Sequence, residues 1–209
     1  MINRKILVVG HPRTGTGYMS KLLSSTGLEI GHEWIGRDGM SCWMFATEDG
    51  NYAPGPRGDI RGLSRKDFEF QHIIHLVKNP FTSMSSIVNV ENAVLGSYEF
   101  RKKYVYINDR GSRLEKAVQS FLGWHEMIEK NIRSSRVIQI ENSQAQLKSF
   151  LADINLPNNY KVLPPTDYNT RKGKKQYSEI TQSEWDNLSV DLKNKLDLFC
   201  EKYGYKNKT

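Results

Sequence analysis

The stretch Arg4–Gly27, RKILVVGHPRTGTGYMSKLLSSTG, decides the fold of this chain. It begins with a short, β-branched apolar run from Ile6 to Val9, which is typical of a strand buried on both faces of a parallel sheet. A glycine-rich turn follows. From Thr16 the apolar residues recur at helical spacing as far as Gly27, a typical helix stop. The stretch therefore predicts a strand, a tight loop and a helix.

The loop at the centre of this stretch is predicted to bind an anion. The first turn of a helix carries unpaired backbone N–H groups, and glycines let a ligand approach the main chain closely. Threonine hydroxyls and the permanent charge of an arginine add further donors. The residues concerned are Gly10, Arg13, Thr14, Gly15, Thr16 and Gly17.

This loop differs from the Walker A motif, GxxxxGK[ST], in two places. Gly10 and Gly15 fit the frame, but Thr16 stands where the motif has lysine, and Gly17 stands where it has the magnesium-binding hydroxyl. The loop is therefore suited to a phosphate without the lysine and metal ion that nucleotide hydrolysis uses. An ordinary glycine-rich turn is the alternative interpretation.

Length and composition favour one globular domain, 1–209. The chain has 209 residues, of which 38% are hydrophobic and 25% charged, enough for a substantial core. We find no run long enough to cross a bilayer, and the first strand begins close to Met1, so we expect a soluble, cytoplasmic protein. Two cysteines, Cys42 and Cys200, form neither a disulfide framework nor a metal cluster, and we expect no metal site.

The net charge of +7 indicates an anionic ligand or partner. Basic residues cluster only at 101–103 and 171–175, and the sequence has no recognition helix, zinc finger or RNA-binding aromatic motif. Nucleic-acid binding is therefore a minor hypothesis.

A second strand-to-helix junction repeats the first. His72 to Val77 is a buried strand, and Asn79 followed by Pro80 is a strong start signal for a helix over 81–94. Lys78 stands at the strand end and Ser86 lies on the helix, so both could reach one anion.

The remaining pattern predicts an α/β fold with a mostly parallel sheet covered on both faces. Further strands are expected at 28–31 and 136–140, and helices at 112–133, at 143–153 and from Thr181. Loops are expected at 34–61 and 156–177, and a loop or an irregular helix at 98–109. The loop over 34–61 is expected beside the glycine loop as a binding loop, or else as a surface excursion covering the core. His125 is expected to be a hydrogen-bonded core histidine, and His72 and His75 should face opposite sides of their strand.

Taken together, these motifs resemble the sulfotransferases that use 3'-phosphoadenosine 5'-phosphosulfate (PAPS), a P-loop-NTPase-like fold. The segment 12–18, PRTGTGY, is similar to that family's 5'-phosphosulfate loop, PKSGTTW. KNPFTSMSS at 78–86 is similar to its 3'-phosphate motif, a basic residue followed eight positions later by serine. RKG at 171–173 resembles its late loop. The resemblance spans nearly the whole chain.

The resemblance implies roles for these residues. The 5'-phosphate would be held by the first motif, and the 3'-phosphate by the second motif and the late loop; the implied cofactor-binding residues are Arg13, Thr14, Gly15, Thr16, Gly17, Tyr18, Lys78, Ser86, Arg171, Lys172 and Gly173. Arg13 replaces the usual lysine that stabilises the leaving oxygen; it can neutralise charge there but is too weak an acid to donate a proton. Lys78 replaces the usual arginine, which keeps the charge and gives up bidentate geometry.

The family also takes the acceptor's proton with a histidine or glutamate near the sulfate. Glu33, with His32 close behind, is the candidate base at the end of the second strand, although both residues could be a solvated turn. Asp38 is a weaker reserve and more typical of a turn with Gly39.

The resulting hypothesis is sulfuryl transfer from PAPS, without a metal, to a hydroxyl or amine of a small molecule or carbohydrate. The segments 34–61 and 98–109 should line the acceptor pocket, whose aromatics and positive charge would accept a sugar, a phenol or an acidic glycan. Two alternatives stay open: a nucleotide or small-molecule kinase with a degenerate phosphate loop, and a non-catalytic nucleotide-binding module.

Overall fold

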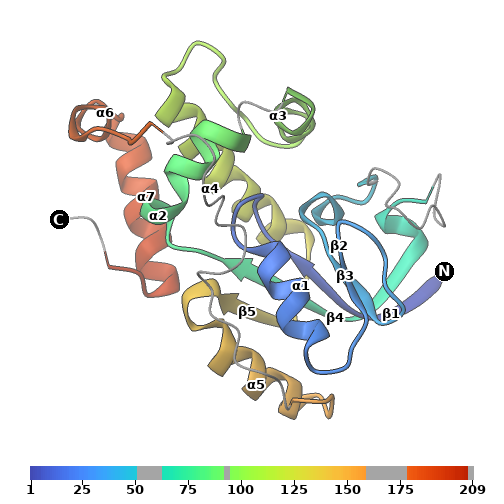
Figure 1. Cartoon of the computed structure of the whole chain (residues 1–209). Helices are drawn as coiled ribbons and strands as arrows, with labels where there is room; N and C mark the ends of the chain where they lie inside the picture. The colour runs from blue at the N-terminus through green and yellow to red at the C-terminus, as the bar shows by residue number, and fades with distance from the viewer. Residues whose placement is uncertain (51–62, 92–94, 159–177, 207–209) are drawn as a thin grey trace.

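A five-stranded parallel sheet forms the centre of the protein (Figure 1). The computed structural model describes residues 1–50, 63–91, 95–158 and 178–206. The strands are β1 (Ile2–Val9), β2 (Ile30–His32), β3 (Gly39–Ser41), β4 (Phe68–Val77) and β5 (Arg136–Gln139). Their order is β2-β3-β1-β4-β5, and every pairing is parallel. The predicted fold class is confirmed.

Helices cover both faces of this sheet (Figure 1). One face carries α1 (Thr16–Ser24) and α5 (Ser143–Asp153), and the other carries α4 (Arg113–Asn131) with a 3-10 turn, η1 (Trp43–Ala46). A third cluster joins α4 to α2 (Pro80–Ser86), the π-helical turn η3 (Ile87–Glu91), α6 (Gln182–Asp186) and α7 (Val190–Tyr203). The remaining elements are α3 (Leu95–Lys102) and two 3-10 turns, η2 (Arg65–Asp67) and η4 (Ile140–Asn142).

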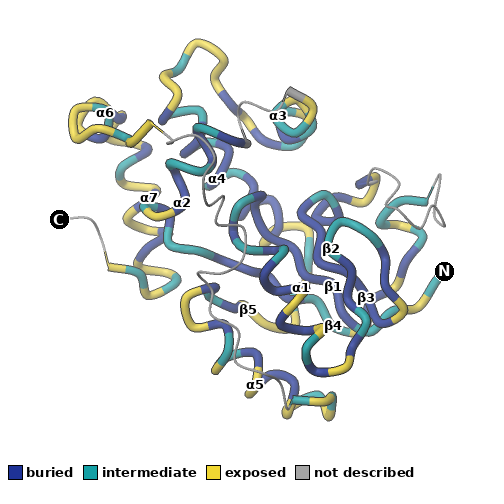
Figure 2. The backbone as a smooth tube through the Cα atoms, viewed as in Figure 1, coloured by how far each residue is buried: buried dark blue, intermediate teal, exposed yellow. Residues whose placement is uncertain are grey.

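The central strand β1 explains why the opening stretch decides the fold. It pairs with β3 on one side and β4 on the other, so its side chains reach only the two layers of helices. Ile6 and Val8 pack in the core under α1 and α5, whereas Leu7 and Val9 pack in the core under α4, and all four are fully buried (Figure 2). An unbroken apolar run is what a strand buried on both faces requires.

The residues predicted to begin or end several helices do so in the structure. The Asn79 side chain accepts a hydrogen bond of 2.9 Å from the Phe81 N–H, with Pro80 in the first turn of α2. Thr181 and Glu184 form a capping box at α6, and Gly27, just beyond α1, has a φ of +96°. The side chains of Asn79 and Thr181 accept hydrogen bonds from N–H groups that a helix start leaves unpaired.

Two predicted elements differ from the structure. The segment 34–61 contains a strand, β3, and the turn η1, and residues 51–62 lie outside the described part. β3 has three residues and pairs through its backbone with β1 and β2, so no sequence period marks it. The second strand, β2, begins two residues later than predicted and includes His32. The segment 98–109, expected as a loop or an irregular helix, begins as the end of helix α3.

Two predicted helices are also divided. The helix expected over 81–94 is α2 followed by the π-helical turn η3, with 92–94 outside the described residues. The closing helix is two helices, because the Ser189 hydroxyl accepts a hydrogen bond from Leu192 N–H and starts α7 separately. A serine in a polar stretch was too weak a signal to predict this break.

The predicted positions of the core histidines are confirmed. His75 Nε2 and His125 Nδ1 share a hydrogen bond of 2.8 Å inside the α4 layer. His72 packs edge-on against Phe150 of α5, on the opposite face of the sheet.

Cys42 and Cys200 are free and buried. No helix in the described ranges is long and apolar enough to span a membrane, and no cluster there of three or more His, Cys, Asp or Glu could hold a metal ion.

Asp38 is a buried structural anchor at the amino-terminal end of β3. Its side chain is 5% exposed and accepts hydrogen bonds or ion pairs from Lys5 (2.9 Å), Arg37 (3.0 Å) and the Glu29 N–H (2.8 Å). Burial by itself raises the pKa of Asp38, but these donors outweigh it and lower the pKa to about 2. The turn predicted at Asp38 therefore also ties β3 to β1.

We expect Asp38→Asn to lower the free energy of unfolding at pH 7 by about 2 kcal/mol, because ionisation of a carboxyl with a lowered folded pKa stabilises the protein above its unfolded pKa. This contribution is lost as the pH falls from about 4 to about 2, so the difference between the two proteins should shrink over that range. Urea titrations from pH 7 to pH 2 measure it. Asp153→Asn breaks an exposed pair with Arg136 and should change stability by less than about 1 kcal/mol; a gap for Asp38→Asn that does not vary with pH would contradict the assignment.

Candidate functional site

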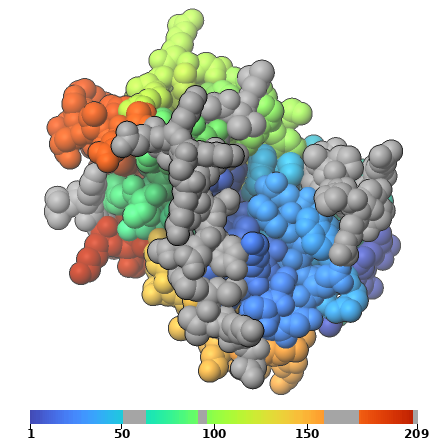
Figure 3. Space-filling model, in the orientation of Figure 1, coloured from blue at the N-terminus to red at the C-terminus, as the bar shows by residue number. Residues whose placement is uncertain are grey.

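Two strand-to-helix junctions meet at the carboxyl-terminal edge of the sheet. β1 and β4 are paired with Val9 opposite His75, so the loops that follow them leave the sheet side by side. Across this gap Arg13 Nε donates a hydrogen bond of 2.8 Å to Ser86 Oγ, 73 residues away in the sequence. In the space-filling view α1 (blue) and α2 (green) lie on the same face of the molecule (Figure 3). The two predicted phosphate motifs therefore lie next to each other in the structure.

The loop between β1 and α1 is held in shape by its own backbone. The Thr14 N–H and hydroxyl both donate to His11 O, at 3.1 and 2.7 Å. Arg13 and Gly15 have φ values of +76° and +98°. Gly15 precedes α1, and a Cβ there would lie 2.7 Å from two Ile140 side-chain carbons. The loop needs glycine at position 15 both for its backbone conformation and for space.

The beginning of α1 offers unpaired donors. No described residue accepts a hydrogen bond from the backbone N–H of Gly15, Thr16 or Gly17. α1 has nine residues and no acidic residue in its first turn, so the positive end of its dipole is not neutralised within the helix. This end of the helix can bind an anion.

His32 covers the position where a Walker A loop carries its magnesium-binding hydroxyl. A Cβ at Gly17 would lie 3.3–3.5 Å from three atoms of the His32 ring, which is close contact. The ring is also 3.3 Å from the Thr16 hydroxyl through Nε2. A side chain at position 17 would therefore require the imidazole to shift by a few tenths of an ångström.

The second junction presents a half-buried lysine. Burial lowers the pKa of Lys78; nearby Glu141 opposes this effect and Arg13 adds to it. No described residue forms a hydrogen bond or ion pair with the Lys78 ammonium. Glu141 instead accepts the Asn79 N–H at 2.9 Å, and the Asn79 side chain already caps α2. At this junction, the side chains of Lys78 and Ser86 rather than the helix end are the groups able to hold an anion.

The two candidate bases lie next to the first helix. The His32 Nε2 atom is 4.0 Å from Glu33 Oε1, and their side chains are 38% and 44% exposed. Burial is the largest influence on the pKa of His32 and lowers it; Glu33 opposes this effect, and Arg13 and Lys21 add to it. The imidazole is therefore largely neutral at pH 7 and able to accept a proton. Glu33 has a φ of +57°, so the backbone is strained at this residue.

A buried polar layer that no sequence motif predicts lies under the loop. His11 Nδ1 donates to Pro12 O at 2.6 Å, so its Nε2 accepts from Ser120 Oγ (2.9 Å) and Arg101 (3.2 Å). Trp124 Nε1 donates to Gly10 O at 3.1 Å. Burial, followed by the charge of Arg101, holds the pKa of His11 well below its usual value. These partners are far apart in the sequence, and no local motif indicates them.

Other predicted site residues have different surroundings. Tyr18 is 5% exposed in the α1 core, and its hydroxyl accepts a hydrogen bond of 3.1 Å from Gln144. Arg171, Lys172 and Gly173 lie outside the described residues. The roles predicted for these residues stay predictions.

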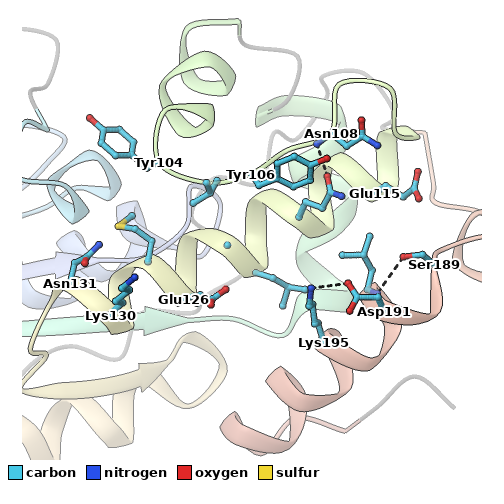
Figure 4. A pocket seen from close by; sticks show the side chains of 16 residues that line it. Tyr104, Tyr106, Asn108, Glu115, Glu126, Lys130, Asn131, Ser189, Asp191 and Lys195 are labelled. Atoms are coloured by element: carbon cyan, nitrogen blue, oxygen red, sulfur yellow. Dashed lines mark hydrogen bonds and ion pairs between the residues drawn. The ribbon is translucent and has the colours of Figure 1, made fainter.

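A separate groove of about 630 Å³ runs along the outer side of α4 (Figure 4). It is lined by residues of α4, of the segment 104–108 and of the start of α7, among them Tyr104, Tyr106, Glu126, Lys130 and Lys195. Among the described residues, the segment 98–109 contributes Tyr104, Tyr106 and Asn108 to this groove. None of the predicted catalytic or nucleotide-binding residues that the structure describes lines it.

The arrangement of the sheet and helices is that of a known class, the sulfotransferase fold. The chain is similar to the sulfotransferase domain from the curacin biosynthetic pathway, with a TM-score of 0.52 and 11% identity, over 98% of this chain and 99% of that domain. It also matches mouse sulfotransferase SULT7A1 complexed with PAP, with a TM-score of 0.43 and 13% identity, over 97% of this chain and 85% of that one. No family model and no curated protein sequence matches the chain. The likeness to the curacin-pathway domain confirms the predicted fold.

We expect Gly15→Ala to lower the free energy of unfolding by about 1–3 kcal/mol, because the new Cβ requires a strained backbone and overlaps Ile140. Chemical denaturation measures the change. Gly96→Ala is the matched control: Gly96 lies in α3 with nothing within 4 Å of an added Cβ, so alanine should leave stability unchanged or raise it slightly. Equal effects at both positions would contradict this description of the loop.

Proposed function

We propose that this chain transfers a sulfuryl group from PAPS to a hydroxyl or amine. The observation that carries the proposal is the hydrogen bond between Arg13 and Ser86, because it joins the motif proposed for the 5'-phosphosulfate to the motif proposed for the 3'-phosphate. A nucleotide phosphorylated at both positions needs two anion-binding groups within its own length. The sulfotransferase fold supports the same conclusion.

The unpaired groups of the site divide between the two ends of that nucleotide. The N–H groups at 15–17, together with Arg13, would hold the 5'-phosphosulfate through charge-assisted hydrogen bonds. Lys78 and Ser86 would hold the 3'-phosphate, and an anion would restore to the Lys78 ammonium the favourable surroundings that burial removes. Further contacts proposed from the resemblance alone are those of Thr14, Tyr18, Arg171, Lys172 and Gly173.

The reaction needs one bond made, one broken and one proton removed. The acceptor oxygen or nitrogen forms a bond to sulfur while the bond from sulfur to the bridging phosphate oxygen breaks. The acceptor's proton passes to Glu33, or to the neutral imidazole of His32, and adenosine 3',5'-bisphosphate leaves. Arg13 stabilises the charge that develops on the leaving phosphate.

The acceptor is proposed to be a small molecule or a carbohydrate. The enzyme itself is proposed to act in the cytoplasm. The support for this acceptor class is the half-exposed position of the two candidate bases, Glu33 and His32, which a small polar molecule could reach from solvent.

A kinase with a degenerate phosphate loop is the competing enzyme, and a binding module without catalysis is the other alternative. Thr16 and Gly17 speak against the kinase, because that class has lysine and a magnesium-binding hydroxyl at these two positions.

We expect adenosine 3',5'-bisphosphate to bind at least 10-fold more tightly than ATP, with no effect of magnesium, as measured by calorimetry. Lys78→Ala should weaken bisphosphate binding by about 10- to 100-fold, since it removes a charged hydrogen-bond donor. Lys195→Ala, an exposed lysine paired with Asp191, is the matched control and should bind normally. Tighter binding of ATP in the presence of magnesium would favour the kinase and overturn the proposal.

We expect Glu33→Gln to slow release of adenosine 3',5'-bisphosphate from PAPS by about 100-fold or more, with water as the acceptor, because the amide cannot take the proton. His32→Asn should have the smaller effect, and neither variant should change the affinity for the bisphosphate by more than a few fold. If His32→Asn is the slower variant, the imidazole is the base. If both variants turn over normally, neither residue is the base; if wild type binds the bisphosphate but transfers to no acceptor, the binding module is favoured.

A further inference from the structure

Two tryptophans lie against each other beneath the site. Trp43 is 7% exposed and Trp124 fully buried, and their ring centroids are 5.7 Å apart with an angle of 61° between the planes. Each indole donates one hydrogen bond of 3.1 Å toward the site: Trp124 to Gly10 O, and Trp43 to Glu33 Oε1. The pair therefore connects the start of the phosphate loop to the candidate base.

The Glu33 side chain has few other constraints. It is 44% exposed, and a half-exposed glutamate samples several rotamers unless a partner restrains it. Within the described ranges, Trp43 is the one residue that donates a hydrogen bond to this carboxylate; His32 Nε2, at 4.0 Å, is too distant. The Trp43 bond engages Oε1, and no described residue donates to Oε2.

The Trp43 ring is itself well fixed. It makes an edge-on contact with Phe100 at 5.4 Å in addition to its contact with Trp124. An indole has only two side-chain torsions, and here the packing restrains both of them. A fixed donor can thus hold one carboxylate oxygen in place and leave the other to meet the acceptor.

We propose that Trp43 is the positioning residue of Glu33, orienting its carboxylate by the Nε1–Oε1 hydrogen bond so that Oε2 faces the acceptor. The inference rests on the proposed function, since it gives Glu33 the role of base. Trp43 touches neither the nucleotide nor the acceptor in this role, and a loss of the N–H should therefore lower kcat and leave nucleotide binding unchanged.

Trp43→Phe tests the proposal, because phenylalanine keeps most of the ring packing and removes the N–H. Turnover is measured as release of adenosine 3',5'-bisphosphate from PAPS, with water as the acceptor. We expect kcat to fall about 10-fold, with the KM for PAPS and the affinity for the bisphosphate within twofold of wild type. Trp124→Phe is the matched control, since it removes the twin N–H from Gly10 O and leaves the bond to Glu33 intact; its kcat should fall less than that of Trp43→Phe.

The double variant separates positioning from packing. In a Glu33→Gln background, Trp43→Phe should cause no further loss of kcat, because there is no base left to orient. An equal loss in both backgrounds, or an unchanged kcat in Trp43→Phe, would overturn the inference. Normal turnover of Glu33→Gln would sink the role of Glu33 itself, and with it this inference.

A second measurement is independent of turnover. The indole N–H resonance of Trp43 should move when Glu33 is replaced by glutamine, and that of Trp124 should not. A crystal structure of Trp43→Phe with adenosine 3',5'-bisphosphate should show the Glu33 carboxylate in a changed or dispersed position beside an unchanged phosphate loop. An unmoved Glu33 side chain would refute the positioning role even if the bisphosphate binds as proposed.

Discussion

The parallel pairing of β1 with β4 is the constraint on which the rest of this structure depends. It aligns Val9 with His75, so the two loops that carry the phosphate motifs start from neighbouring positions at one edge of the sheet. The hydrogen bond from Arg13 to Ser86 is a consequence of that alignment. Antiparallel pairing would send the loops to opposite edges, and the two motifs could not share a ligand.

Beneath this edge, α4 holds the first loop in place through polar contacts in a buried layer. Ser120 bonds to His11, and Trp124, one turn further along the same face of α4, bonds to Gly10 O. A buried polar group that keeps its partner fixes a unique arrangement, whereas one that loses it is costly. These anchors engage the beginning of the loop and leave its last N–H groups, at 15–17, without acceptors among the described residues.

Backbone strain coincides with the proposed chemistry. Arg13 and Glu33 are two of three described non-glycine residues with a positive φ, at +76° and +57°. Each such conformation costs roughly 1–3 kcal/mol unless the surroundings stabilise it. Ser86 bonds the Arg13 side chain, and Trp43 bonds that of Glu33. The third, Asn155, lies just beyond α5 and takes no part in the site.

The sequence by itself determined the parts of the fold that depend on neighbouring residues. The run from Ile6 to Gly17 specified strand, loop and helix, and Asn79-Pro80 specified the start of α2, because periodicity and capping act within a few residues. The three-residue strand β3 needed β1 beside it, and the bonds of His11 and Trp43 needed partners that only packing supplies. Long-range pairing carries no local signal, since its free energy comes from contacts formed after the chain has closed on itself; the tertiary structure alone therefore decided that Arg13 meets Ser86 and that Glu33 has a fixed donor.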